Sequence, residues 1–78
     1  MIIKASEARE NLIAGNEYLR RDLLLLGLYL QNASKRSNSY IHTIPISLIE
    51  FKNTYINILK DLGFKVETNQ EVVLIILW

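Results

Sequence analysis

The residues able to do acid–base or metal chemistry are few in this chain. It has one histidine, His42, which lies in a segment of β-strand composition, and it has no cysteine. A metal or catalytic site needs several groups that converge, either as ligands or as a nucleophile, a base and an orienting group. No carboxylate stands near His42 in the sequence. We therefore interpret His42 as a surface or sheet-face histidine and predict no metal-binding residue.

The acidic residues form two close pairs that could be read as acid–base pairs. Glu7 and Glu10 stand at the start of a predicted helix, where the helix dipole alone explains both. Glu67 and Glu71 flank a predicted turn and have no third group beside them. We predict no catalytic residue and no cofactor, and we expect a protein that is not an enzyme.

Two basic pairs, Arg20-Arg21 and Lys35-Arg36, are the remaining candidates for contact with a ligand. With nearby tyrosines they could hold a phosphate and stack a base, and the alternative is a solvated helix face balanced by Glu17 and Asp22. The net charge is only +1, which argues against a nucleic-acid partner and leaves a small-molecule ligand open. The tyrosines are Tyr18, Tyr29 and Tyr40.

The spacing of apolar residues predicts one long N-terminal helix from about Ser6 to about Ala33, with Ser6 as its N-cap. Gly15-Asn16 interrupts the apolar stripe and could bend or split the helix, but we favour a continuous one. The stripe is expected to face the core because its members recur every three, four or seven residues. It consists of Ala5, Ala8, Leu12, Leu19, Leu23, Leu26 and Leu30.

A short strand is expected at about Tyr40 to Ile44, followed by a second helix with clear end signals. Residues 47–50 match a capping box, in which Ser47 and Glu50 satisfy free amides at the helix start. Gly63 and Phe64 match a Schellman stop at the helix end. The core face of this helix is expected to consist of Leu48, Phe51, Tyr55, Ile58, Leu59 and Leu62.

The last part of the chain predicts a β-hairpin. Residues 64–68 alternate between apolar and polar, and residues 72–78 are all apolar, with a turn expected at Asn69 and Gln70. We predict a single α+β domain over residues 1–78. Its long helix, short strand, second helix and hairpin form a three-stranded antiparallel sheet, with two helices on one face and the last strand in the middle.

This domain carries more apolar side chains than a chain of 78 residues can bury. Four of them lie outside the core stripe of the first helix, and three point away from the helices in the last strand, where side chains alternate between faces. We predict that these residues bind another protein or a second copy of the chain. The candidate interface consists of Leu24, Leu25, Leu28, Tyr29, Val73, Ile75 and Leu77.

Residues 4–9, residues 62–67 and the final strand ending in Trp78 give the chain a pattern that resembles a loose group of small, mostly uncharacterised phage proteins. Their pattern is an opening helix, a short strand, a second helix, and a hairpin that ends in an isoleucine-rich strand and tryptophan. This chain departs from it with Leu77, where a small polar residue is typical, and with a more leucine-rich first helix. Both departures add apolar surface.

The resemblance implies a non-enzymatic phage protein that acts through protein–protein contacts, as a small virion or capsid-associated component. The alternative is a phage inhibitor of a host defence system, which blocks an enzyme or sequesters a signalling nucleotide. The apolar residues 23–30 are far fewer than the roughly 20 that a membrane-spanning helix needs, and no signal-peptide pattern is present. We expect the protein in the virion or the host cytoplasm, neither secreted nor membrane-spanning.

Overall fold

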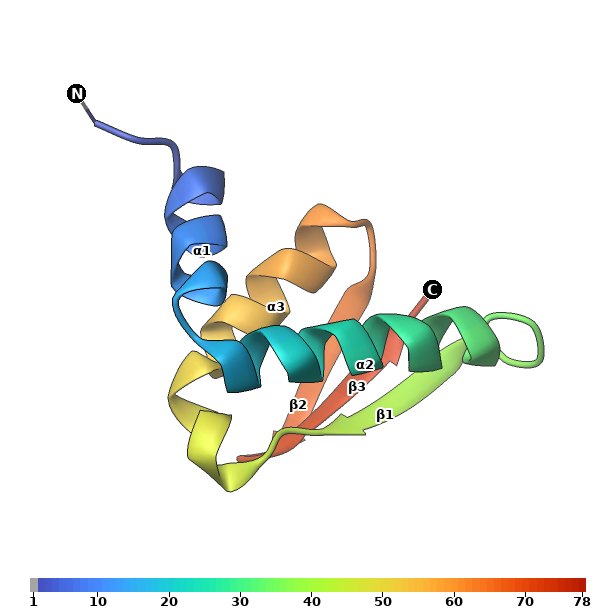
Figure 1. Ribbon diagram of the computed structural model, residues 1–78. Coiled ribbons are helices and arrows are strands. Elements are labelled where there is room, and N and C mark those ends of the chain that lie inside the picture. The colour runs from blue at the N-terminus through green and yellow to red at the C-terminus, as the bar shows by residue number, and fades with distance from the viewer. Residues whose placement is uncertain (1) are drawn as a thin grey trace.

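A three-stranded antiparallel sheet packs against helices in the computed structural model, which describes residues 2–78 (Figure 1). The α+β class and the order of helix, strand, helix and two strands are confirmed. The elements are α1 (Ala5–Ala14), α2 (Glu17–Ala33), β1 (Ser39–Thr43), a 3₁₀ helix η1 (Ile46–Phe51), α3 (Lys52–Asp61), β2 (Lys65–Gln70) and β3 (Val73–Leu77).

β3 is the central strand, with β1 and β2 antiparallel on its two sides, as predicted. A central strand is covered on both edges, which suits the apolar β3 sequence. The turn after β2 falls at residues 71–72, so the prediction of a turn at Asn69 and Gln70 is wrong. The reason is a register shift between Glu67 and Gln70, a β-bulge that lets β2 continue past the predicted turn.

The prediction of one continuous N-terminal helix is wrong, because the chain breaks into α1 and α2 at Gly15-Asn16. Asn16 has extended backbone angles (φ −129°, ψ 102°), and its side-chain oxygen accepts a hydrogen bond of 3.0 Å from the Leu19 amide. This N-cap starts a new helix, which therefore leaves α1 pointing away from the line of α2 (Figure 1). Lys4, not Ser6, is the N-cap residue of α1.

α1 contributes no buried residue, so the predicted core stripe fails in its first part. Ala5, Ala8 and Leu12 are exposed, because the break at Gly15-Asn16 turns α1 off the helix layer. α1 is held by an ion pair between Arg9 and Asp61 at the end of α3. It is therefore peripheral to the packed part of the fold.

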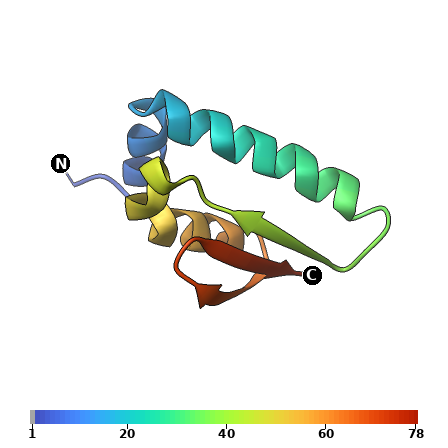
Figure 2. The ribbon, with the colours of Figure 1, turned by 90° about the horizontal axis from the view of Figure 1, so that it is seen from below.

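The core lies between the sheet and the helices α2 and α3, and Figure 2 shows α2 lying along β1. Leu74 and Ile76 of the central strand are completely buried beneath the two helices. Each large apolar side chain that is fully buried contributes about 1.5–3 kcal/mol. The buried apolar residues are Leu19, Leu26, Leu30, Ile44, Leu48, Tyr55, Leu59, Leu74 and Ile76.

The second helix begins differently from the prediction and ends as predicted. Its first turns form the 3₁₀ helix η1, in which no side chain caps the start, so the capping box at Ser47 and Glu50 is wrong. The tight turn begins at Pro45, whose carbonyl accepts a hydrogen bond of 2.8 Å from the Leu48 amide three residues on, the pattern of a 3₁₀ helix. At the other end, Gly63 (φ +96°) and Phe64 make the two Schellman hydrogen bonds.

Two glycines test this account of the helices in opposite directions. Gly63→Ala should lower the free energy of unfolding by about 1 kcal/mol or more, because a Cβ is strained at positive φ. Gly27→Ala should raise it by up to about 1 kcal/mol, because Gly27 is exposed inside α2 and an added Cβ meets nothing within 4 Å. Urea unfolding measures both, and equal effects of the two substitutions would contradict the assignment.

Candidate functional site

The outward face of α2 carries the four apolar residues that the sequence singled out there. The exposed fractions are 66% for Leu24 and 57% for Leu28, and Leu25 and Tyr29 are also exposed. The opposite side of the same helix is buried through Leu19 and its neighbours in the core. α2 is therefore apolar on two sides, and only one of them is covered within residues 2–78. The outward face, as we use the term below, consists of Leu24, Leu25, Leu28 and Tyr29.

The open face of the sheet holds the other three candidates, Val73, Ile75 and Leu77, which are half-buried. The neighbouring strands β1 and β2 cover these side chains from both sides, and no helix covers them from above. Ile41 of β1 lies directly opposite Ile75 and is 63% exposed. Sequence reasoning missed Ile41, and only the register of β1 against β3 places it on this face.

The structure does not bring the two candidate surfaces together. α2 packs on the side of the sheet where Leu74 and Ile76 are buried, and Val73, Ile75 and Leu77 lie on the other side. The outward face of α2 is farther still from the sheet, on the outside of the helix layer. The seven residues therefore form two separate surfaces on opposite sides of the molecule.

A groove between α2 and α3 extends the outward face of α2 toward the end of α3. It encloses about 270 Å³, and its walls are apolar except for Arg20 at one side. Leu62, expected in the core, is 69% exposed at its rim because α3 ends there. With Arg20 as its one polar side chain, the groove suits apolar side chains better than a polar small molecule. Its lining includes Leu23, Leu24, Gly27, Leu30, Ile58 and Leu62.

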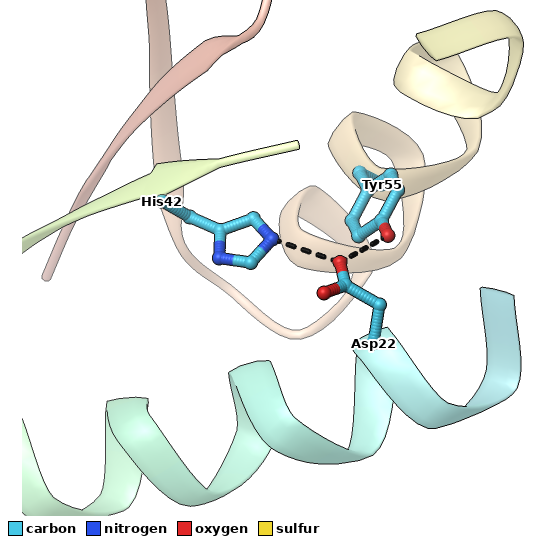
Figure 3. Close-up of polar contacts among 3 residues, drawn as sticks. All are labelled: Asp22, His42 and Tyr55. Carbon is cyan, nitrogen blue, oxygen red and sulfur yellow. Dashed lines mark hydrogen bonds and ion pairs between the residues drawn. The ribbon is translucent and has the colours of Figure 1, made fainter. Parts of the chain in front are cut away.

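A polar cluster lies beneath α2, where the sequence indicated no site (Figure 3). Oδ2 of Asp22 in α2 lies 3.0 Å from Nε2 of His42 in β1, and it also accepts a hydrogen bond from the hydroxyl of Tyr55 in α3. His42 is on the covered face of the sheet and only 5% exposed, so a sheet-face position is confirmed and a surface position is wrong. Three elements thus meet at one carboxylate oxygen.

The cluster pairs a histidine with a carboxylate that also accepts a hydrogen bond from a tyrosine hydroxyl. A His–carboxylate pair can activate a nucleophile, but no serine or threonine hydroxyl within residues 2–78 bonds to His42. The rings of His42 and Tyr55 pack at 5.7 Å between centroids. Burial, followed by the hydrogen bond to Asp22 and the charge of Asp22, raises the pKa of the Tyr55 hydroxyl far above its usual value. The Tyr55 hydroxyl therefore keeps its proton, and the cluster joins α2, β1 and α3.

Sequence reasoning missed this cluster because its members are far apart in the sequence. Asp22 lies 20 positions from His42 and 33 positions from Tyr55. The sequence suggests a solvated helix face for Asp22, but its side chain is only 16% exposed. One signal was present in the sequence. Asp22 directly precedes Leu23 and lies four residues before Leu26, so it borders the core stripe of α2.

Some of the residues that the sequence offered as a possible phosphate and base site are brought together near the end of α2. The rings of Tyr29 and Tyr40 lie 6.1 Å apart between centroids, and Arg36 lines the same hollow. Burial, Tyr29 and the charge of Asp22 raise the pKa of the Tyr40 hydroxyl. Since a negative carboxylate nearby disfavours an anion, the hollow is a weak phosphate site. The basic pair Arg20-Arg21 does not line it.

Comparisons with protein-family models, with curated proteins and with solved structures find no significant match to this chain. The resemblance to small phage proteins therefore stays a prediction. Over the described residues, no helix combines the length and the apolar character that crossing a bilayer requires. The two apolar surfaces, the groove and the buried cluster are the features from which a function must be argued.

Tyr55→Phe tests the buried cluster. The loss of the hydroxyl should lower the free energy of unfolding at neutral pH by about 1.5–3 kcal/mol, because a hydrogen bond to a carboxylate is lost. Above a pH of about 10, the unfolded chain releases the Tyr55 proton while the folded protein retains it. Tyr55 should therefore lower the free energy of unfolding of the unmodified protein by up to about 1.4 kcal/mol for each pH unit in this range.

Tyr55→Phe should remove the part of the alkaline loss of stability that comes from the Tyr55 hydroxyl. The free energy of unfolding of the variant should therefore depend less on pH in the alkaline range. Urea unfolding between neutral and alkaline pH measures both effects. Tyr18→Phe is the matched control, because Tyr18 is 72% exposed and has no hydrogen-bond partner for its hydroxyl within residues 2–78. Identical pH profiles for the Tyr55 variant and the unmodified protein would contradict the assignment.

Proposed function

We propose that this chain is a non-enzymatic protein that acts through protein–protein contacts of the outward face of α2, with another protein or with a second copy of itself. In line with its resemblance, we propose a small virion or capsid-associated component of a phage. The observation that supports the proposal is the exposure of Leu24 and Leu28 on a helix whose opposite side is already in the core. A helix that is apolar on two sides needs cover on both.

Burial of the exposed leucines on this surface would contribute favourably to binding. Each leucine that passes from exposed to fully buried gains about 1.5–3 kcal/mol. Tyr29 adds an aromatic side chain at the edge, and aromatic residues are enriched in protein interfaces. Monomeric proteins seldom leave large contiguous apolar patches exposed without a function. These three points favour a protein partner for the outward face.

The buried cluster supports a role without catalysis. A general base must reach the substrate's proton within hydrogen-bond distance. His42 and Tyr55 lie beneath α2, where His42 is 5% exposed and Tyr55 is fully buried. The most reactive combination of residues in the described chain is therefore occupied in holding the fold, which directs attention to its surfaces.

The alternative function, inhibition of a host defence system, is favoured by one observation. The hollow formed by Tyr29, Tyr40 and Arg36 has two aromatic rings and one cation, which a nucleotide could use. The charge of Asp22 nearby works against it, and we rank it second. Mass spectrometry of small molecules bound to the protein from infected cells would support this alternative if it found a nucleotide.

The double substitution of Leu24→Glu and Leu28→Glu tests the proposed function. The variant should fold, because both side chains are exposed, but its affinity for the partner should fall at least tenfold, because two apolar contacts become buried charges. The measurement is quantitative mass spectrometry of purified phage particles and of proteins copurified from infected cells.

The matched control is Asn53→Glu with Asn57→Glu, which places the same charges four residues apart on an exposed side of α3. The control should behave like the unmodified protein. If the Leu24 and Leu28 variant entered particles and retained its bound proteins as well as the control did, the proposal would be wrong.

A further inference from the structure

We propose that the partner of the outward face is a second copy of this chain, with the two α2 helices antiparallel about a two-fold axis level with Leu26. The inference rests on the proposed role of this face as a protein interface and names its occupant. Its basis is the order of side chains along α2, which is complementary to itself when the helix is reversed.

A straight stripe of six exposed residues runs along the outside of α2 and the turn after it. Its members alternate spacings of four and three, the spacing that keeps side chains on one line of a helix facing a partner helix. The turn continues the spiral, because the amides of Lys35 and Arg36 bond to the carbonyls of Asn32 and Ala33. The stripe consists of Glu17, Arg21, Leu24, Leu28, Gln31 and Lys35.

The stripe is symmetric about the level of Leu26. Leu24 and Leu28 are equally far from that level, so in an antiparallel pair Leu24 of one copy faces Leu28 of the other. The same symmetry places Arg21 opposite Gln31 and Glu17 opposite Lys35 of the second copy. The two leucines thus form the centre, and polar and charged residues form the two ends, as in protein interfaces generally.

Charge selects the antiparallel arrangement over the parallel one. Two parallel copies in register would place Glu17 against Glu17, Arg21 against Arg21 and Lys35 against Lys35, which is repulsive at three levels. In the antiparallel pair, Glu17 of one copy forms an ion pair with Lys35 of the other at each end. Arg21 of one copy then faces the side-chain amide of Gln31 of the other. Lys35 has no ion-pair partner within the described chain, and it gains one in the dimer.

The interactions of each chain with itself are compatible with this pairing. Nη2 of Arg21 lies 3.5 Å from Oε1 of Glu17, and both side chains are about two-thirds exposed. Glu17 can therefore keep this contact and accept a second one from Lys35 of the other copy. A helix pair of this length buries little surface for a stable dimer, so we expect dissociation in the micromolar range.

Disulfide trapping tests the register, because the chain has no cysteine of its own. Purified Glu17→Cys and Lys35→Cys variants are mixed, oxidised and separated without reductant. The disulfide that joins one variant to the other should form in large excess over disulfides that join two copies of the same variant. Each variant has a single cysteine, so a disulfide within one chain is excluded.

The control replaces the second variant with Asn57→Cys, on the exposed side of α3, which should yield no preferred mixed disulfide. Sedimentation equilibrium across the micromolar range gives the association itself. Lys35→Glu should weaken dimerisation roughly threefold to tenfold, and Glu17→Lys combined with Lys35→Glu should restore it. Leu24→Glu should leave the chain monomeric.

A chain that stays monomeric across the micromolar range, or disulfides that form mainly between like positions, would overturn the inference. The proposed function would survive that result if the Leu24 and Leu28 substitutions still removed particle association. In the reverse case, disulfide trapping between positions 17 and 35 together with unchanged particle association of the Leu24 and Leu28 variant would support the dimer. It would reject the outward face as the contact with the particle.

Discussion

One carboxylate oxygen, Oδ2 of Asp22, determines how the helices lie over the sheet. It receives hydrogen bonds from His42 on β1 and from Tyr55 on α3, while Asp22 itself belongs to α2. A mostly buried charge is costly unless it is hydrogen-bonded, so both contacts must form together. Shifting α2 along its axis by one turn, about 5.4 Å, would break both of them. Apolar packing alone tolerates such shifts more readily than this cluster does.

With α2 fixed in this way, the small size of the domain leaves the outside of α2 without cover. α2 and α3 both pack with their inner sides on one face of the sheet, and α1 is turned away by the Asn16 cap. No element within the described residues remains to pack on Leu24 and Leu28. Exposure of the outward face is therefore a consequence of the topology, and a second molecule is the remaining source of apolar cover.

The sequence predicted the layers and the Schellman end of α3, because these depend on apolar periodicity or on neighbours close in the chain. The central position of β3 was a hypothesis, since it depends on pairing with β1, which is far away in the sequence. The sequence prediction failed where two local signals competed. At Gly15-Asn16 the apolar periodicity favoured a continuous helix, but the Asn16 side chain caps the Leu19 amide and its extended backbone angles start a new helix. The cluster of Asp22, His42 and Tyr55 was missed because its contacts are long-range and each residue has an ordinary role in its own segment.

The difference between local and long-range contacts also explains why the outward face of α2 was easier to predict than the open face of the sheet. The outward face of α2 follows from helical periodicity alone, so Leu24 and Leu28 were identifiable from their spacing. The open sheet face depends on strand register, and its most exposed apolar residue, Ile41, comes from a strand that the sequence placed without fixing its partner. The antiparallel stripe is again a property of one helix read in both directions. Self-recognition through α2 is thus encoded locally, whereas the orientation of α2 on the sheet is encoded by a contact among three distant segments.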